Sequence, residues 1–203
     1  LSVGIDNFHL YILLGLVMWN FFADTVKDAM SSVMGKADIL KSIRFKPSLL
    51  VLSTCLHSFV TYLINVVVFL IIYLFSGFVI DIYLLGFLLL SALLFVFVYA
   101  SALLVSYFYM QLDDIDHIWD VVSQMLFWMT PIVYPINNVP QLFERFYMLN
   151  PVTRFVVHGR SLMLYDRVPP TKQLLITAFI TLFLTGVTMY VFRHQSRRFI
   201  ERL

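Results

Sequence analysis

The sequence predicts an all-α membrane protein with about five membrane-crossing helices. Its 203 residues are 61% hydrophobic and 13% charged, whereas an average soluble domain is roughly 45–50% apolar and 25% charged. The apolar residues form long runs separated by short polar connections, without the strict alternation of a barrel strand. Because only helices and closed barrels satisfy their backbone in lipid, these runs are predicted to be helices.

The first predicted span, residues 10–34, carries Asp24, Lys27 and Asp28 on its later turns, so its charged end is expected to leave the bilayer. The second predicted span, residues 48–75, is interrupted by small polar residues, by His57 and by Asn65. Two interpretations of His57 and Asn65 stay open. They line a polar path, or they make hydrogen bonds between helices.

The third predicted span, residues 82–110, contains no charged residue. The fourth, residues 117–134, ends close to Pro131, and the fifth, residues 172–193, follows Pro170, which suits the approach to a helix. No charge is expected deep in any of the predicted spans, and this disfavours a proton- or sodium-coupled secondary transporter.

Basic residues near span ends predict the orientation, because they accumulate on the cytoplasmic side. They gather after the first span and after the fifth, at Lys36, Lys41, Arg44, Lys46, Arg193, Arg197, Arg198 and Arg202. Both of these regions are therefore predicted to be cytoplasmic, with Leu1 and residues 76–81 outside. Residues 136–172 would then be external although they also carry arginines, which is the one tension in this topology.

Two short elements are expected between the spans. Residues 35–46 place Ile39 and Ile43 opposite the basic residues, as in an amphipathic helix on the membrane surface. Residues 139–165 hold apolar stretches too short to cross, which predicts re-entrant or interfacial helices. An arginine there, such as Arg160, could meet an anionic ligand or extend to lipid headgroups.

Motifs for catalysis are not found in the sequence. The pair Gly35-Lys36 lacks the rest of a phosphate-binding loop, so no ATP hydrolysis is expected from this chain. The five histidines are scattered and Cys55 is alone, so no metal site, no bound cofactor and no nucleic-acid partner are predicted. The acidic run of residues 113–116 precedes the fourth span and is interpreted as a helix cap.

Aromatic residues surround the predicted outer end of the fourth span. They are Phe127, Trp128, Tyr134, Phe143, Phe146 and Tyr147. They fit an interfacial aromatic belt, or an exit on which flat sugar rings and lipid tails could stack.

Four short segments, in this order, resemble the permease (transmembrane) subunit of type 2 ABC exporters. They are residues 15–22 (GLVMWNFF), residues 44–47 (RFKP), residues 130–135 (TPIVYP), and Asn150-Pro151 followed by Arg160. Within that family they look most like the branch that exports lipid-linked polysaccharides, such as the O-antigen of lipopolysaccharide, capsule or teichoic acid. Many members carry Arg-Asp where this chain has Asp113-Asp114, so no transport role is assigned there.

The resemblance implies a single permease domain over residues 1–203 that has about five of an expected six membrane helices, lacking an N-terminal amphipathic helix and the first span. It implies export across a bacterial or archaeal cytoplasmic (inner) membrane by two permeases, as a homodimer, and two ABC ATPase subunits that bind ATP and magnesium. Residues 35–46 correspond to the coupling helix that docks on the ATPase, through Lys36, Ile39, Lys41, Arg44 and Phe45.

Residues 139–165 correspond to gate helices. Together with the aromatic residues, this places Phe127, Trp128, Tyr134, Phe146, Tyr147, Asn150, Pro151 and Arg160 along the substrate path or gate. Alternatives are a type 2 ABC exporter of a drug or small lipid, and a membrane-embedded transferase acting on a lipid-linked sugar.

Overall fold

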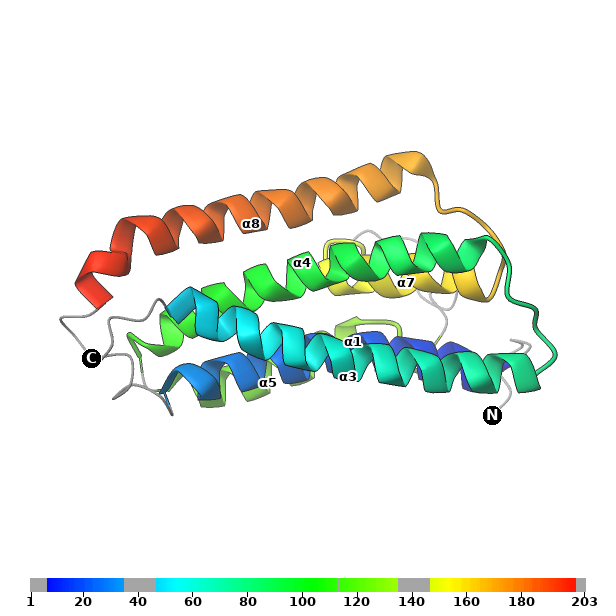
Figure 1. Ribbon diagram of the computed structural model, residues 1–203, viewed down its shortest axis with the longest axis horizontal. Coiled ribbons are helices and arrows are strands. Elements are labelled where there is room, and N and C mark those ends of the chain that lie inside the picture. Colours follow the sequence, from blue (N-terminus) through cyan, green and yellow to red (C-terminus); the bar gives the residue numbers. More distant parts are fainter. Residues whose placement is uncertain (1–6, 35–46, 113, 135–146, 200–203) are drawn as a thin grey trace.

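The computed structural model describes residues 7–34, 47–112, 114–134 and 147–199, without the side chains of residues 34, 47 and 192–199. These residues form α1 (Phe8–Met34), α3 (Pro47–Phe75), α4 (Tyr83–Tyr109), α5 (Ile115–Met129), α7 (Pro151–Met163) and α8 (Thr171–Phe199) (Figure 1). No strand occurs in the part of the chain that the structure describes. The prediction of an all-α fold is confirmed.

The four long helices run along the long axis of the molecule (Figure 1). Helix α3 is antiparallel to α1 and to α4, whereas α8 runs in the same direction as α4. Within the described residues, 4 helices are long and apolar enough to cross a membrane, over Phe8–Val33, Ser48–Phe75, Tyr83–Tyr109 and Thr171–Val191. They correspond to the predicted first, second, third and fifth spans. The protein is therefore a multi-pass membrane protein.

Helix α5 is shorter than the predicted fourth span, residues 117–134. It has 15 residues and ends at Met129, so it is about 22 Å long, less than the ~30 Å of a hydrocarbon core. The cause is Pro131, which lacks an N–H and bars the helical conformation at the residue before it. Thr130 accordingly has extended dihedral angles, φ −97° and ψ 126°.

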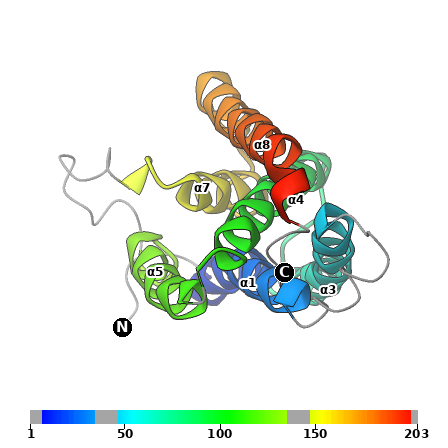
Figure 2. The same ribbon diagram turned by 90° about the vertical axis from the view of Figure 1, so that its left-hand side faces the viewer.

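Helix α1 lies at the centre of the bundle. It packs against α3, α4 and α7, and Leu10, Leu14 and Met18 on it are completely buried. Helix α8 lies at the edge along α4 (Figure 2), where large apolar side chains such as Phe179 and Leu182 are exposed. Apolar side chains exposed over a spanning helix face lipid, so α8 forms part of the outer wall.

The ends of the helices group as the predicted topology requires. The end of α1, the start of α3 and the end of α8 lie at one end of the bundle, and the turn between α3 and α4 lies at the other end, together with α7 (Figure 1). Which end is cytoplasmic stays a prediction. The predicted coupling helix, residues 35–46, falls outside the described residues, as do residues 139–146 of the predicted gate helices.

Candidate functional site

Helix α7 is a short helix packed inside the protein. Asn150 caps its first turn by accepting a hydrogen bond from the backbone N–H of Val152 at 3.0 Å, and Pro151 occupies the first turn, where its missing N–H costs nothing. Its 13 residues are too few to cross a membrane. The helix instead presses against α1 and α4, which buries Arg160, with only 2% of its surface exposed.

The guanidinium of Arg160 binds backbone carbonyl groups from two other parts of the chain. It donates two hydrogen bonds to the carbonyl of Tyr11, at 3.1 and 2.9 Å, one to that of Pro131 at 2.5 Å and one to that of Ile132 at 2.9 Å. Its central carbon also lies 3.4 Å from the centre of the Tyr11 ring, a cation–π contact. Arg160 therefore ties α7 to α1 and to the segment after α5.

The break after α5 explains why this arginine is needed. Pro131 and Ile132 follow the end of the helix, so no N–H of a next helical turn reaches their carbonyl groups. Ile132 is also completely buried, where an unpaired carbonyl costs about 1–3 kcal/mol. A guanidinium with its five donors can serve several such carbonyls at once, which an ammonium group does less well.

Gly15 on α1 makes room for the guanidinium. A β-carbon at this position would lie 2.6 Å from an Nη atom of Arg160 and 3.2 Å from the side chain of Ile132. This close approach of side chains to the backbone of α1 requires glycine.

Asn150 joins the start of α7 to the end of α5. Its side-chain amide donates a hydrogen bond to the hydroxyl of Thr130 at 3.0 Å, and that hydroxyl donates to the carbonyl of Leu126 at 2.7 Å. Thr130 is completely buried, and Asn150 is 7% exposed. The amide thus serves both helices, as a cap for α7 and as a link to α5.

Three of the four segments singled out in the sequence meet at this place. We call the group the Arg160 cluster: Tyr11, Gly15, Thr130, Pro131, Ile132, Asn150 and Arg160. The fourth segment, residues 44–47, falls largely outside the described residues. The interpretation in which Arg160 extends to lipid headgroups is wrong, because its charged group is buried and bonded to backbone.

The aromatic residues at the end of α5 divide into an inner and an outer set. Phe127 packs edge-on against Trp19 of α1, with ring centres 5.6 Å apart, while Trp128 is 62% exposed. Tyr134 donates a hydrogen bond to the carbonyl of Trp128 at 2.6 Å and packs against Tyr147, with ring centres 6.2 Å apart. Phe146 lies outside the described residues, and the choice between a belt and an exit stays open.

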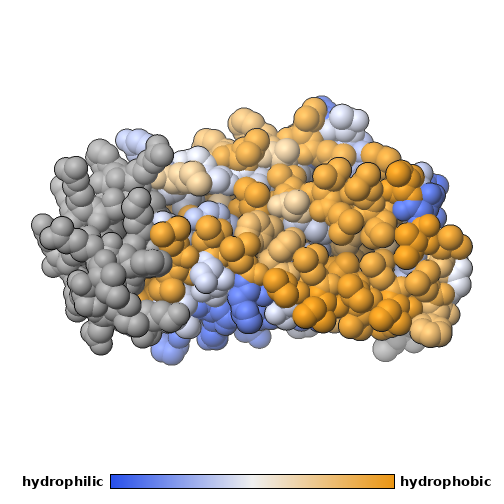
Figure 3. All heavy atoms as spheres, in the orientation of Figure 1, coloured by the Kyte–Doolittle hydropathy of each residue, from blue (hydrophilic) through white to orange (hydrophobic). Residues whose placement is uncertain are grey.

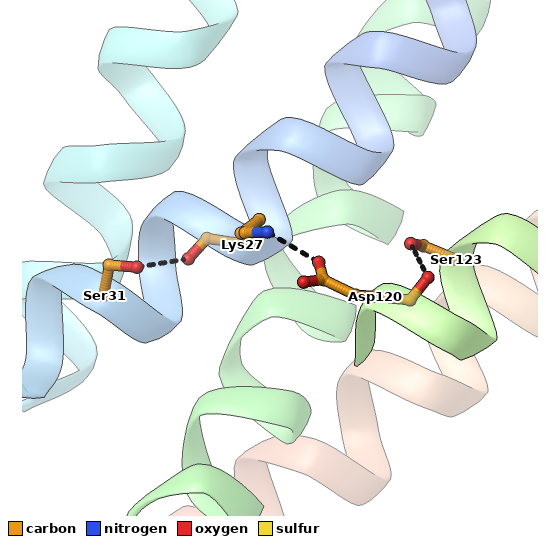
Figure 4. A network of polar contacts seen from close by, with 4 residues as sticks. All are labelled: Lys27, Ser31, Asp120 and Ser123. Atoms are coloured by element: carbon orange, nitrogen blue, oxygen red, sulfur yellow. Dashed lines mark hydrogen bonds and ion pairs between the residues drawn. The ribbon is translucent and has the colours of Figure 1, made fainter. Parts of the chain in front are cut away.

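An ion pair joins α1 to α5 nearer the opposite end. The ammonium of Lys27 donates to a carboxylate oxygen of Asp120 at 2.6 Å, and Ser31 and Ser123 donate to the backbone carbonyls of these two residues (Figure 4). About half of each charged side chain is exposed, 47% and 50%. Asp114, the N-cap residue of α5, does not make the expected side-chain cap hydrogen bond, whereas Asp116 lies in the first turn, where a carboxylate favours the helix dipole.

The ion pair belongs to a larger row of exposed polar side chains, which we call the polar strip. Its members are Asn20, Asp24, Lys27 and Asp28 on α1, His57, Thr61 and Asn65 on α3, and Asp120 on α5. Figure 3 shows a hydrophilic patch on a largely hydrophobic face, over the part of the molecule where α1 and α3 lie. Among the described residues, no group of three or more metal-binding side chains is found.

Tyr11, Lys27 and Asp120 are not among the site residues predicted from the sequence. Tyr11 contributes to the site through its backbone carbonyl and its ring. Because every residue has a backbone carbonyl, no sequence pattern predicts which carbonyl binds Arg160. Asp120 could have been singled out from the sequence. It is a charged residue within the predicted fourth span, and charged residues within spans are often functional.

These features define a multi-pass membrane protein that presents polar groups along its spans. They are the bundle of apolar helices, the break that a buried arginine stabilises, and the exposed polar strip. Residues 2–164 match the model of the ABC-2 type transporter family. The chain belongs to this family, and membership implies an ATPase partner.

Similar proteins are known from two bacteria. An O-antigen export system permease protein RfbA of Myxococcus xanthus is 20% identical over 202 residues, which cover 98% of this chain and 78% of that protein. Two proteins of the same description from Klebsiella pneumoniae are 22% and 24% identical, and each match covers 100% of this chain and 78% of the relative.

Proposed function

We propose that this chain is the membrane-spanning subunit of an ATP-driven exporter that carries a lipid-linked polysaccharide across the cytoplasmic membrane of a bacterium or archaeon. The observation that carries the proposal is the polar strip. Polar and charged side chains on membrane helices are costly unless they face water or polar cargo, and they mark substrate pathways. A polysaccharide is a cargo rich in hydroxyl groups, which such side chains can bind.

The relatives support the class of cargo. The proteins from Myxococcus xanthus and Klebsiella pneumoniae are described as O-antigen export permeases, and the matches extend over nearly all of this chain. O-antigen, capsule and teichoic acid share the feature that matters here, a hydrophilic polymer attached to a lipid, and O-antigen is the cargo that we propose.

ATP hydrolysis takes place on a separate subunit in this proposal. Two ATPase copies that bind ATP and magnesium would dock on residues 35–46 of two permease copies, through Lys36, Ile39, Lys41, Arg44 and Phe45. The polar strips of the two permeases would face each other across the path of the polymer, because a strip turned toward lipid would be destabilising. The path would leave past the aromatic residues and the Arg160 cluster.

The experiment is purification of the full-length protein in mild detergent, followed by mass spectrometry of the co-purifying proteins. An ABC ATPase in equal amount is expected. Changing Lys41, Arg44 and Phe45 to alanine should remove it. The matched control changes Arg167, in the connection before α8, and Lys172, in the first turn of α8, which are both exposed. The start of α8 lies at the opposite end of the bundle from the start of α3 (Figure 1), so this control should keep the ATPase.

The cargo is tested by ATP hydrolysis of the reconstituted complex. A polyprenyl-linked glycan should stimulate hydrolysis more than the same lipid without sugar. Absence of any ATPase partner would remove the exporter proposal and would return the membrane-embedded transferase to first place.

One observation favours a second candidate, export of a small lipid or drug. An apolar groove of about 430 Å³ runs between α4, α7 and α8, with Leu90, Leu93 and Leu174 among the residues of its walls. An acyl chain or an apolar drug fits such a surface. Equal stimulation by the sugar-free lipid would favour this candidate.

A further inference from the structure

A cavity of about 170 Å³ lies between α1 and α3, within the polar strip. Its polar lining consists mainly of Asn20, Asp24, Asp28, His57, Thr61 and Asn65. Thr61 is the midpoint of α3 (Pro47–Phe75), and Asn20 is next to the midpoint of α1 (Phe8–Met34). The cavity is therefore near the centre of α1 and α3, and Asp24 lies within one helical turn of the midpoint of α1.

The surface of α3 around the cavity has two different faces. Thr61 and Asn65, four residues apart, line the cavity, while the neighbouring Val60, Ile64 and Val67 are 57%, 59% and 55% exposed. Exposed apolar side chains at this depth suit lipid, and exposed amides and carboxylates do not. The cavity face must meet water or a polar ligand.

The chemistry of the lining selects a neutral ligand with many hydroxyl groups. Carboxylates accept hydrogen bonds, while amides, hydroxyls and an imidazole both donate and accept them, which together match the hydroxyl groups of a sugar ring. Phe21 and Tyr62 complete the wall with aromatic carbon, a surface for the apolar face of a sugar. No lysine or arginine lines the cavity, so phosphate groups would meet two carboxylates without a cation.

A second observation comes from Thr25, which also lines the cavity. Thr25 is completely buried, and its hydroxyl has no hydrogen-bond partner among the described residues. Other hydroxyls on these two helices donate to the carbonyl four residues earlier, such as Ser31 to Lys27 and Thr61 to His57. A buried hydroxyl left without this bond is available to a ligand.

We propose that this cavity is a subsite for one neutral sugar unit of the glycan, separate from the place where the lipid and its phosphate groups bind. The inference rests on the proposed function, which it makes more specific. The polymer would pass with one sugar unit at a time held by α1 and α3, near the middle of its path through the membrane.

Single cysteines on α3 provide the test. Cys55, the one cysteine of the sequence, is buried, so the unchanged protein gives the background. Thr61→Cys and Asn65→Cys place a thiol in the cavity, and Ile64→Cys is the matched control on the neighbouring apolar face. The complex with its ATPase, in lipid nanodiscs, is treated with a small hydrophilic methanethiosulfonate reagent, which reacts with the thiolate and so needs access to water.

The two cavity cysteines should react faster than the control. A polyprenyl-diphosphate-linked tetrasaccharide at ten times its dissociation constant should slow their reaction about tenfold, because occupied sites are protected in proportion to ligand binding. Polyprenyl diphosphate without sugar should leave the rate unchanged.

Three results would overturn the subsite. Equal protection by both probes would mean that lipid or phosphate covers the cavity, and no protection by either would mean that sugar does not enter it. Reaction as slow as that of the control in every sample would mean that lipid or protein covers this face. The proposed function fails separately, on the absence of an ATPase or of glycan-stimulated hydrolysis, and neither result depends on the cavity thiols.

Discussion

Arg160 shows how one residue can hold a break in a membrane bundle together. Its guanidinium serves three carbonyls, of Tyr11, Pro131 and Ile132. Changing Arg160 to Lys keeps the charge but cannot place donors on all three in fixed geometry. We expect a loss of roughly 2–4 kcal/mol in stability, since at least one buried carbonyl is left unpaired at about 1–3 kcal/mol.

The measurement is a thermal shift with a thiol-reactive fluorophore, which reports unfolding through the buried Cys55. Arg167→Lys is the control, because Arg167 is exposed. An unchanged melting temperature for Arg160→Lys would show that the hydrogen bonds to the carbonyls contribute little.

A second prediction at this scale compares two helical glycines. A β-carbon on Gly15 would lie 2.6 Å from the Arg160 guanidinium, whereas one on Gly186 of α8 would meet nothing within 4 Å. Gly15→Ala should therefore lower stability by about 1–3 kcal/mol through overpacking. Gly186→Ala should raise it by up to about 1 kcal/mol, because alanine favours the helix. The same thermal shift decides, and equal effects of the two changes would contradict the close approach at Gly15.

At the scale of the elements, α7 depends on its first residue. Asn150→Ala removes the cap, which costs about 1–2 kcal/mol, and also removes the hydrogen bond to Thr130. Asn150→Asp keeps an acceptor for the Val152 N–H but loses the amide donor. Hydrogen exchange should therefore be fast at the Val152 amide in the alanine variant and slow in the aspartate variant. Fast exchange in both would show that the link to Thr130, and not the cap, holds the start of α7.

The long helices were predictable and the cluster between them was not. Composition and the length of the apolar runs predict α1, α3, α4 and α8. A long apolar segment in lipid must satisfy its own backbone hydrogen bonds, and a helix does so. The end of α5 was foreseen only in part, because a proline ends a helix but apolar residues such as Ile132 continue beyond it.

The candidate site depends on tertiary contacts that sequence patterns do not contain. Asn150, Pro151 and Arg160 were singled out from a resemblance, but burial of Arg160 against the backbone of Tyr11 joins residues 149 positions apart. The polar strip was foreseen only in part, at the polar residues of the second span such as Asn65, for a related reason. The sequence alone predicts Asp24 to lie at the charged end of a span. In the structure, Thr61 and Asn65 of α3 line the same cavity as Asp24.

At the scale of the whole molecule, the ion pair between Lys27 and Asp120 connects α1, which leads into the predicted coupling segment, to α5, which leads to the Arg160 cluster. Both side chains are about half exposed, and exposed pairs contribute little to stability. Their value would lie in holding the two helices in register along the polymer path while the ATPase moves the coupling segment.

Reversing one charge therefore separates transport from folding. Lys27→Asp places two like charges side by side and should strongly reduce glycan export and glycan-stimulated ATP hydrolysis, with little change in the melting temperature. The double variant Lys27→Asp with Asp120→Lys restores an opposite pair and should recover a large part of both activities, because a pair that sets register depends on its attraction and not on which helix carries which sign. Surface glycan and ATPase rates would be measured for both variants and for Asp120→Lys alone. Rescue by the double variant would show that transport depends on the attraction between the two residues. Three equally inactive variants would instead mean that each charge contacts the cargo or the second permease separately.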